Sequence, residues 1–193
     1  MKASVHNIVI PIAGLATRMY PSSKVVPKAM MPIYDYYTNT CAPLLLFLVQ
    51  QTLLSFDEHE QPLIHFIVIV NPSHKQIYEE FFFAETLHAA SHCAELQQLG
   101  KQITFVEQEQ QLGLGHAILM SKPFFKTYQN NADTTEGFVV LLGDHVFVSY
   151  DSHNRECVRQ VVDAFKFFND TNQKSAAVLG LTLCKEEDLH LYG

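Results

Sequence analysis

A basic segment near the start of the chain carries the residues best suited to chemistry. Arg18, Lys24 and Lys28 lie close together in the sequence, and Gly14 precedes them. No acidic residue occurs before Asp35, whereas the rest of the chain carries nine basic and twenty acidic residues. Three cations beside accessible backbone N–H groups could pair with a polyphosphate through charge-assisted hydrogen bonds. The segment predicts a nucleoside triphosphate site, although solvated cations around an ordinary turn would give the same composition.

Two later segments could complete such a site. Leu112–Ala117 contains two glycines ahead of an expected helix, which suits either a close backbone approach to a ligand or a tight turn. Asp144 follows the apolar run Phe138–Leu142. Mg²⁺ prefers one or two carboxylates together with phosphate oxygens and water, so this carboxylate could supply part of a magnesium site. An Asp after a buried strand can also simply cap the next turn.

The elements that must position these residues alternate along the chain. Short apolar runs predict the buried strands of one parallel or mixed sheet: Asn7–Ile12, Ile64–Val70, Ile103–Val106, Phe138–Leu142 and Ala176–Leu183. Apolar residues at spacings of three and four predict helices between them: Pro43–Phe56, Lys75–Leu99, Gly115–Ser121 and Arg155–Phe168. The alternation predicts an α/β fold, a Rossmann-like doubly wound mixed sheet with helices on both faces. Ligands of such folds bind beyond the carboxyl ends of the strands.

Composition limits the classes of function. A chain of 193 residues, 48% hydrophobic and 17% charged, can bury one core, so we expect a single domain over residues 1–193. The formal net charge of -7 disfavours binding to a nucleic-acid polymer or to an anionic membrane. No apolar run approaches the roughly 20 residues that span a bilayer. The four cysteines show no paired spacing and the first residues do not read as an export signal, so we expect a cytoplasmic protein.

Taken together, these segments resemble the nucleotidyltransferase family of sugar-1-phosphate pyrophosphorylases. Ile10–Met19, followed by Pro21, Lys24, Pro27-Lys28 and Met30–Pro32, is similar to the signature loop of that family. Val106–Gln108 together with Leu112–Ala117 is similar to the segment that reads the base, and Gly143-Asp144 stands where the family holds its first magnesium Asp. The resemblance covers nearly the whole chain and is strongest to the bacterial members that act on UTP and glucose 1-phosphate.

The resemblance implies a role for each matching residue in substrate binding. Ala13 and Gly14 would approach the nucleotide, and Lys24 would add a further substrate contact. Gln108 and Gly113 would contact the uracil base. The terminal Gly193 resembles part of the family's sugar site.

The resemblance also implies the chemistry. A phosphate oxygen of glucose 1-phosphate would attack the α-phosphorus of UTP in line and expel pyrophosphate, giving UDP-glucose. Arg18 and Lys28 would be the catalytic cations that hold the triphosphate, so catalysis would rest on positioning and charge neutralisation. Asp144 would bind Mg²⁺, the expected cofactor.

Three departures from the family pattern keep alternatives open. Ala16 stands where the family usually has Gly, and Ala29 replaces a Glu. Family members also continue beyond the position of Gly193 for a second half that carries further sugar and metal ligands. We therefore expect either the nucleotide-binding part of a longer enzyme or a natural remnant. Another sugar-1-phosphate nucleotidyltransferase, or a non-catalytic nucleotide-binding or interaction domain, would share the same loop, and a homo-oligomer stays open.

Overall fold

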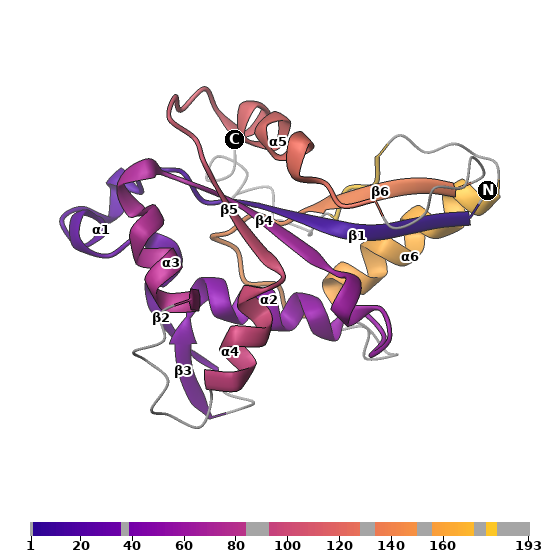
Figure 1. Ribbon diagram of the computed structural model, residues 1–193, viewed down its shortest axis with the longest axis horizontal. Coiled ribbons are helices and arrows are strands. Elements are labelled where there is room, and N and C mark those ends of the chain that lie inside the picture. Colours follow the sequence, from indigo (N-terminus) through magenta and orange to yellow (C-terminus); the bar gives the residue numbers. More distant parts are fainter. Residues whose placement is uncertain are drawn as a thin grey trace, which may run out of the picture.

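The centre of the fold is a parallel sheet. The computed structural model describes residues 2–35, 39–83, 93–127, 134–149, 156–171 and 177–180. The sheet contains β1 (Lys2–Pro11), β4 (His65–Val70), β5 (Ile103–Glu107) and β6 (Thr134–Val140), in the order β5-β4-β1-β6 (Figure 1). All three pairings are parallel. Every residue of β4 is buried, which explains why all of this strand except His65 is apolar.

Helices cover both faces of this sheet. α2 (Leu44–Leu54), α3 (Lys75–Phe83), α4 (Cys93–Gly100) and α6 (Cys157–Asp170) lie on one face, and α5 (Leu114–Ser121) lies on the other (Figure 1). Side chains alternate between the two faces along each strand. In β1, Ile8 and Ile10 pack into the core between the sheet and the helices α2 and α3, whereas Val9 packs with Ala117 of α5. The predicted doubly wound α/β fold is confirmed.

Short elements fill the connections. β2 (Pro32–Asp35) and β3 (Thr40–Pro43) form a separate antiparallel pair that the sequence did not predict. The other short elements are α1 (Ser22–Val25) and the 3₁₀ turns η1 (Thr17–Met19), η2 (Lys28–Met30), η3 (Gln61–Leu63), η4 (Pro72–His74) and η6 (Lys122–Phe124). η4 begins where the Asn71 side chain accepts a hydrogen bond from the backbone N–H of Ser73 at 3.0 Å. Among the described residues, no helix is long and apolar enough to cross a membrane.

Some expected elements differ from the structure. Within the expected strand Ala176–Leu183, residues 177–180 do not form a strand, and the remainder lies outside the described residues. The expected helix Lys75–Leu99 is described only as α3 and α4, because residues 84–92 are not described. In α6, Val162 is buried, whereas Phe168, near the end of the helix, is 37% exposed. The four strands of the main sheet are all parallel, and the only antiparallel pairing among the described residues is in the separate β2–β3 pair.

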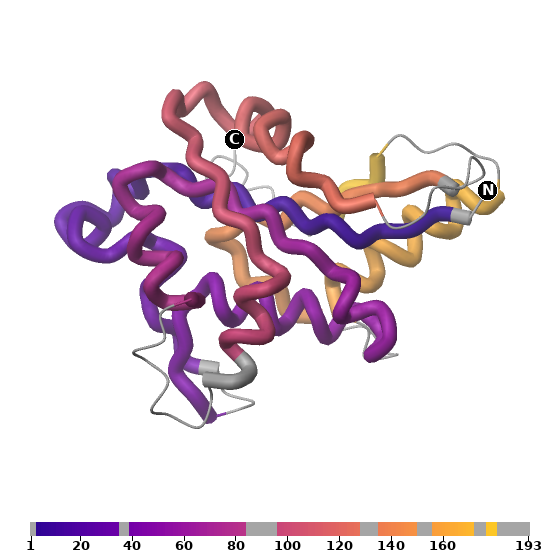
Figure 2. Tube along the Cα trace, in the orientation of Figure 1, coloured from indigo at the N-terminus to yellow at the C-terminus, as the bar shows by residue number. Residues whose placement is uncertain are grey.

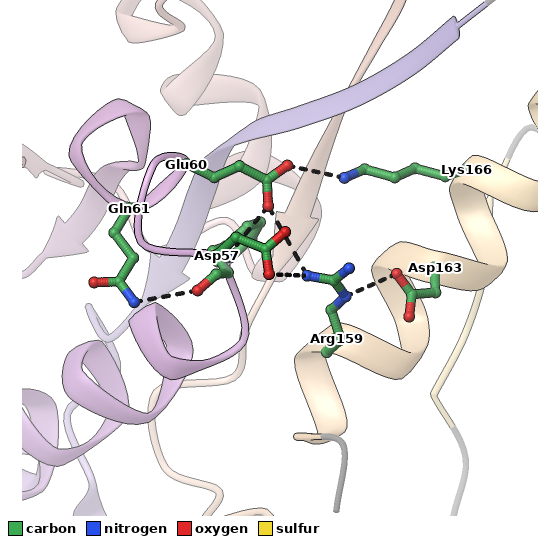
Figure 3. A network of polar contacts seen from close by, with 7 residues as sticks. Asp57, Glu60, Gln61, Arg159, Asp163 and Lys166 are labelled. Carbon is green, nitrogen blue, oxygen red and sulfur yellow. Dashed lines mark hydrogen bonds and ion pairs between the residues drawn. The ribbon is translucent and has the colours of Figure 1, made fainter. Parts of the chain in front are cut away.

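An ion-pair network holds α6 against the segment that leads into β4 (Figure 3). Arg159 Nε contacts Asp163 Oδ1 at 2.9 Å, and its Nη1 lies 3.5 Å from Asp57 Oδ1. Lys166 Nζ lies 3.2 Å from Glu60 Oε1. Partial burial opposes ionisation of Glu60, but the backbone N–H of Asp57 and the Lys166 ammonium outweigh it and hold the pKa of Glu60 below its ordinary value. The network fixes the helix that follows the loop after β6.

Candidate functional site

The strand order creates a switch point between β1 and β6. From β1 the chain moves to β4 and then to β5 on one side, and it returns to place β6 on the other side of β1. In open α/β sheets the loops diverge at such a point and leave a crevice beyond the strand ends. Figure 2 traces the segments after β1, β5 and β6 to the same end of the sheet. Gln108 directly follows β5, Ala13 lies two residues after β1, and Asp144 lies four residues after β6.

Lys28 and Asp144 meet across this switch point. Lys28 Nζ lies 2.9 Å from Asp144 Oδ2, and His145 Nδ1 lies 2.8 Å from Asp144 Oδ1. The Lys28 and Asp144 side chains are 37% and 47% exposed, so a ligand can reach both. Partial burial raises the pKa of Asp144, but the Lys28 ammonium and the His145 ring outweigh it and leave the pKa below its ordinary value. Asp144 is therefore ionised at neutral pH.

Both members of this pair stand on short, tightly packed turns. Lys28 begins η2, and the next residue, Ala29, is buried at 2% exposure in the core beside α2. A small apolar residue at position 29 thus lets η2 pack on the core while Lys28 reaches the site. Asp144 follows Gly143, where a Cβ would lie 2.0 Å from Ile12 Cγ2. The turn after β6 is therefore in direct contact with the end of β1.

The segment after β5 forms a second, more enclosed part of the site. Gln108 is buried, and its Nε2 lies 3.3 Å from the carbonyl oxygen of Gly113 and 3.0 Å from Nδ1 of His116. Gly113 has a φ of 92°, a conformation that L side chains rarely adopt, and it caps α5. The structure thus brings Gln108 and Gly113, the two expected base-binding residues, into contact. It adds His116, which the sequence offered only as part of the Leu112–Ala117 match.

A hydrogen bond joins the loops after β1 and β5. Gln111 Nε2 donates to the carbonyl oxygen of Ala13 at 3.0 Å, so the two expected nucleotide-binding segments lie side by side. Ala13 is buried, whereas Gly14 is exposed and a Cβ there would meet no atom within 4 Å. Gln111 lies in a polar stretch with no motif of its own, so a single sequence gave no signal for this contact.

Among the described residues, Asp144 contacts Lys28 and His145 but neither of the other two basic residues of the loop. Arg18, in η1, is exposed and forms no ion pair within the described part of the chain. Lys24, in α1, lines a cavity of about 630 Å³ together with Leu15, Thr17, Tyr20, Ser23, Ser73 and His74. Ala16 adopts the left-handed conformation, with φ 49° and ψ 42°. The loop therefore contains the unusual backbone geometry that a glycine would favour.

The expected sugar-site residue Gly193 and the expected metal are not part of this geometry. Gly193 lies outside the described residues. Among the residues that the structure describes, no group of three or more His, Cys, Asp or Glu side chains could hold a metal by itself. Of the described side chains, a metal here would take the Asp144 carboxylate, with oxygen ligands from substrate and water beside it.

A parallel doubly wound sheet, with a basic loop and a carboxylate at its switch point, defines an α/β domain of the nucleotide-binding type. The chain belongs to the nucleotidyl transferase family, which matches residues 8–182. The family resemblance seen in the signature loop is thereby confirmed.

Relatives and solved structures agree with this assignment. UTP–glucose-1-phosphate uridylyltransferase from Staphylococcus epidermidis is 29% identical over 98% of this chain, and a Bacillus subtilis protein of the same name is 29% identical over 100%. The match covers 58% of either relative, so the chain spans somewhat more than half of their length. UDP-glucose pyrophosphorylase from Acinetobacter baumannii superposes with a TM-score of 0.60 at 25% identity, over 88% of this chain and 54% of that one. A UDP-glucose pyrophosphorylase complexed with UDP-glucose gives a TM-score of 0.61 at 22% identity, over 86% of this chain and 55% of that one, and supports the fold alone.

Proposed function

We propose that this chain supplies the nucleotide-binding part of a uridylyltransferase that converts UTP and glucose 1-phosphate into UDP-glucose and pyrophosphate. The observation that carries the proposal is the contact between Lys28 and Asp144 at the switch point, at the same end of the sheet as the buried amide of Gln108. A cation and an ionised carboxylate at this place suit a triphosphate and its counter-ion. The choice of UTP and glucose 1-phosphate as substrates follows the relatives, which are named for these two compounds.

In this proposal the phosphate oxygen of glucose 1-phosphate attacks the α-phosphorus of UTP, and the bond to the bridging oxygen of pyrophosphate breaks. The attacking oxygen is already ionised, so no side chain has to remove a proton. Lys28 and Arg18 neutralise charge on the departing phosphates, and Lys24 contributes from the cavity beside the loop. Ala13, Gly14, Gln108 and Gly113 hold the nucleoside. Gly193 would lie near the sugar.

The residues present also fit a divalent cation. Nucleotidyltransferases of this kind generally use one. Asp144 offers an ionised, partly exposed carboxylate, which matches the preference of Mg²⁺ for one or two carboxylates plus phosphate and water oxygens. When bound, Mg²⁺ would polarise the phosphate oxygens and align them with the attacking group. Lys28, which now contacts Asp144, would then be free to hold a phosphate.

Equilibrium binding to the 193-residue chain tests the proposal. UTP, ATP, CTP, GTP and dTTP are titrated with Mg²⁺, and the UTP titration is repeated on Asp144→Ala. We expect selective UTP binding that weakens about 10-fold or more in the variant, since a charge-assisted interaction is lost. The control Glu79→Ala removes a surface carboxylate on α3 of similar exposure and should leave UTP affinity unchanged. With EDTA in place of Mg²⁺, the difference between parent and Asp144→Ala should disappear.

The same titrations separate the alternatives. Preference for another nucleotide would favour a different sugar-1-phosphate nucleotidyltransferase. Failure of all five nucleotides to bind would refute a nucleotide-binding role for this chain. UTP binding without pyrophosphate release in the presence of glucose 1-phosphate would indicate a nucleotide-binding part that lacks turnover alone.

A further inference from the structure

Gln108 is an almost fully buried amide whose hydrogen bonds can be accounted for. Its side chain lies at the end of β5 and the residue is 4% exposed. Buried amides must find partners within the protein or in a ligand, because an unpaired polar group out of water is costly. The Nε2 atom has two neighbours, the Gly113 carbonyl oxygen at 3.3 Å and His116 Nδ1 at 3.0 Å. A primary amide has two N–H groups, so each neighbour can receive one.

The Gly113 carbonyl fixes which end of the amide faces it. That oxygen also accepts the backbone N–H of Ala117 at 3.2 Å, in the first turn of α5. If the Gln108 amide were reversed, its oxygen would face this carbonyl oxygen, and two acceptors would meet without a proton between them. The amide nitrogen must therefore point toward Gly113 and His116. His116 Nδ1 must in turn be the unprotonated ring nitrogen, since it accepts the second N–H.

This arrangement leaves one unused group, the amide oxygen. Among the described residues, none donates a hydrogen bond to Gln108 Oε1. This oxygen is not fully enclosed by the protein, so a ligand can reach it. Both donors of the amide are already engaged by the protein. The side chain can therefore offer a ligand only a hydrogen-bond acceptor.

We propose that His116 is a positioning residue that locks the Gln108 amide, so that the site selects a nucleobase with a ring N–H at its pairing edge. This inference rests on the proposed function, in which Gln108 contacts the base. Uracil carries a hydrogen on N3, whereas cytosine has a bare lone pair there. A locked acceptor therefore favours uracil over cytosine at that atom. Without His116, only the longer 3.3 Å contact with the Gly113 carbonyl would oppose a 180° rotation of the amide, and the rotated amide could donate to cytosine instead.

α5 gives His116 a firm support. The helix begins directly after Gly113, and Ala117, the residue after His116, is buried against β1 and β4. The imidazole is thus carried by a helix packed on the sheet rather than by a free loop. Gly113, with its positive φ, turns the chain so that its carbonyl and the His116 ring reach the same amide.

The test compares UTP and CTP on His116→Ala and His116→Asn. The Asn side chain can place its Oδ1 where Nδ1 of His116 lies, so it keeps an acceptor for the amide, whereas Ala does not. We expect the parent to prefer UTP over CTP by about 10-fold or more, in line with one buried hydrogen bond gained and one mismatch avoided. His116→Ala should reduce the preference to within about 3-fold, and His116→Asn should retain most of it. A purely structural role would weaken both nucleotides equally, and that result would overturn the inference.

A second measurement does not depend on nucleotide binding. Side-chain amide signals of ¹⁵N-labelled protein report on Gln108, with Gln111 as the matched control because its amide bonds to Ala13 and not to His116. We expect His116→Ala to speed hydrogen exchange at the Gln108 amide and to leave Gln111 unchanged. If the Gln108 signals do not change, His116 does not position the amide. If the parent binds no nucleotide, the proposed function fails, while an altered Gln108 signal would still establish the lock. If it binds UTP and CTP equally, the base selection fails and the nucleotide-binding proposal stands.

Discussion

Replacing Gly143 with Ala should disturb the site through a contact that the structure defines. A Cβ at this position would lie 2.0 Å from Ile12 Cγ2 and 3.0 Å from Ile10 Cγ2. Carbon atoms pack at about 3.5–4.0 Å, so the Ile12 side chain, the turn or the end of β1 must move by more than about 1 Å. Because Asp144 is the next residue, the same movement should lengthen its 2.9 Å contact with Lys28.

The expected magnitude follows from the cost of overpacking. An extra methyl group forced into a well-packed site destabilises a protein by about 1–3 kcal/mol. For a chain of this length, each kcal/mol lowers the melting temperature by roughly 2–4 °C. Gly115→Ala is the matched control, since a Cβ at Gly115 meets no atom within 4 Å. Gly115 lies in the first turn of α5, where Ala is the better helix former, so this control should be neutral or slightly stabilising.

Urea unfolding followed by far-UV circular dichroism measures the effect, because the chain has no tryptophan to report it by fluorescence. A double-mutant cycle with Ile12→Ala isolates the contact. That substitution removes the offending Cγ2, and the remaining Ile12 Cβ lies at 3.5 Å, an ordinary contact distance. The double variant should therefore be more stable than the sum of the two single losses. Strict additivity, or a Gly143→Ala loss below about 0.5 kcal/mol, would refute the reasoning.

Three other substitutions give separate predictions. Arg18→Ala should leave the free energy of unfolding within about 0.5 kcal/mol of the parent, because the side chain is exposed, yet it should weaken UTP binding roughly 10-fold or more. The control Lys101→Ala removes an exposed lysine at the other end of β5 and should change neither quantity. Burial and the nearby Lys126 lower the pKa of His65 to about 4 in the folded protein. As pH falls below about 6.5, His65 therefore becomes protonated in the unfolded chain while it stays neutral in the folded one. Stability should drop by about 2 kcal/mol between pH 7 and pH 5, and His65→Gln, which cannot titrate, should remove this part of the pH dependence in urea titrations. Ala16→Gly should raise the free energy of unfolding by up to about 1 kcal/mol, since it relieves the left-handed φ of 49° at some cost in chain entropy. The control Ala13→Gly, at a buried position, should lower the free energy of unfolding.

The sequence predicted the elements whose residues are apolar throughout or on one face. β4 is a run of six buried residues, and α2 and α5 have the expected positions within one or two residues. The parallel topology then placed the loops after β1 and β6 at one end of the sheet. The unusual residue Ala16 was noticed because a Cβ stands where the family has none, and its left-handed φ supplies the physical meaning.

Contacts between distant loops could not be predicted. The Lys28–Asp144 pair and the Gln111–Ala13 hydrogen bond depend on how each loop turns after its strand. No hydrophobic period reports that geometry, because these side chains are polar. The β2–β3 pair was missed for a different reason: strands of four residues are too short to show a period against the surrounding turns.

The position of β1 in the sheet has a consequence for how the site is assembled during folding. β1 precedes its partners by long stretches of chain: Asn7 pairs with His65, and Lys2 pairs with Thr134. Parallel pairings between such distant segments form slowly and leave apolar strands unpaired in the meantime. During synthesis the loop that carries Lys28 therefore emerges well before Asp144. An intermediate with β1, β4 and β5 paired would already hold Gln108 beside Gly113, while the carboxylate side of the crevice would form only when β6 joins.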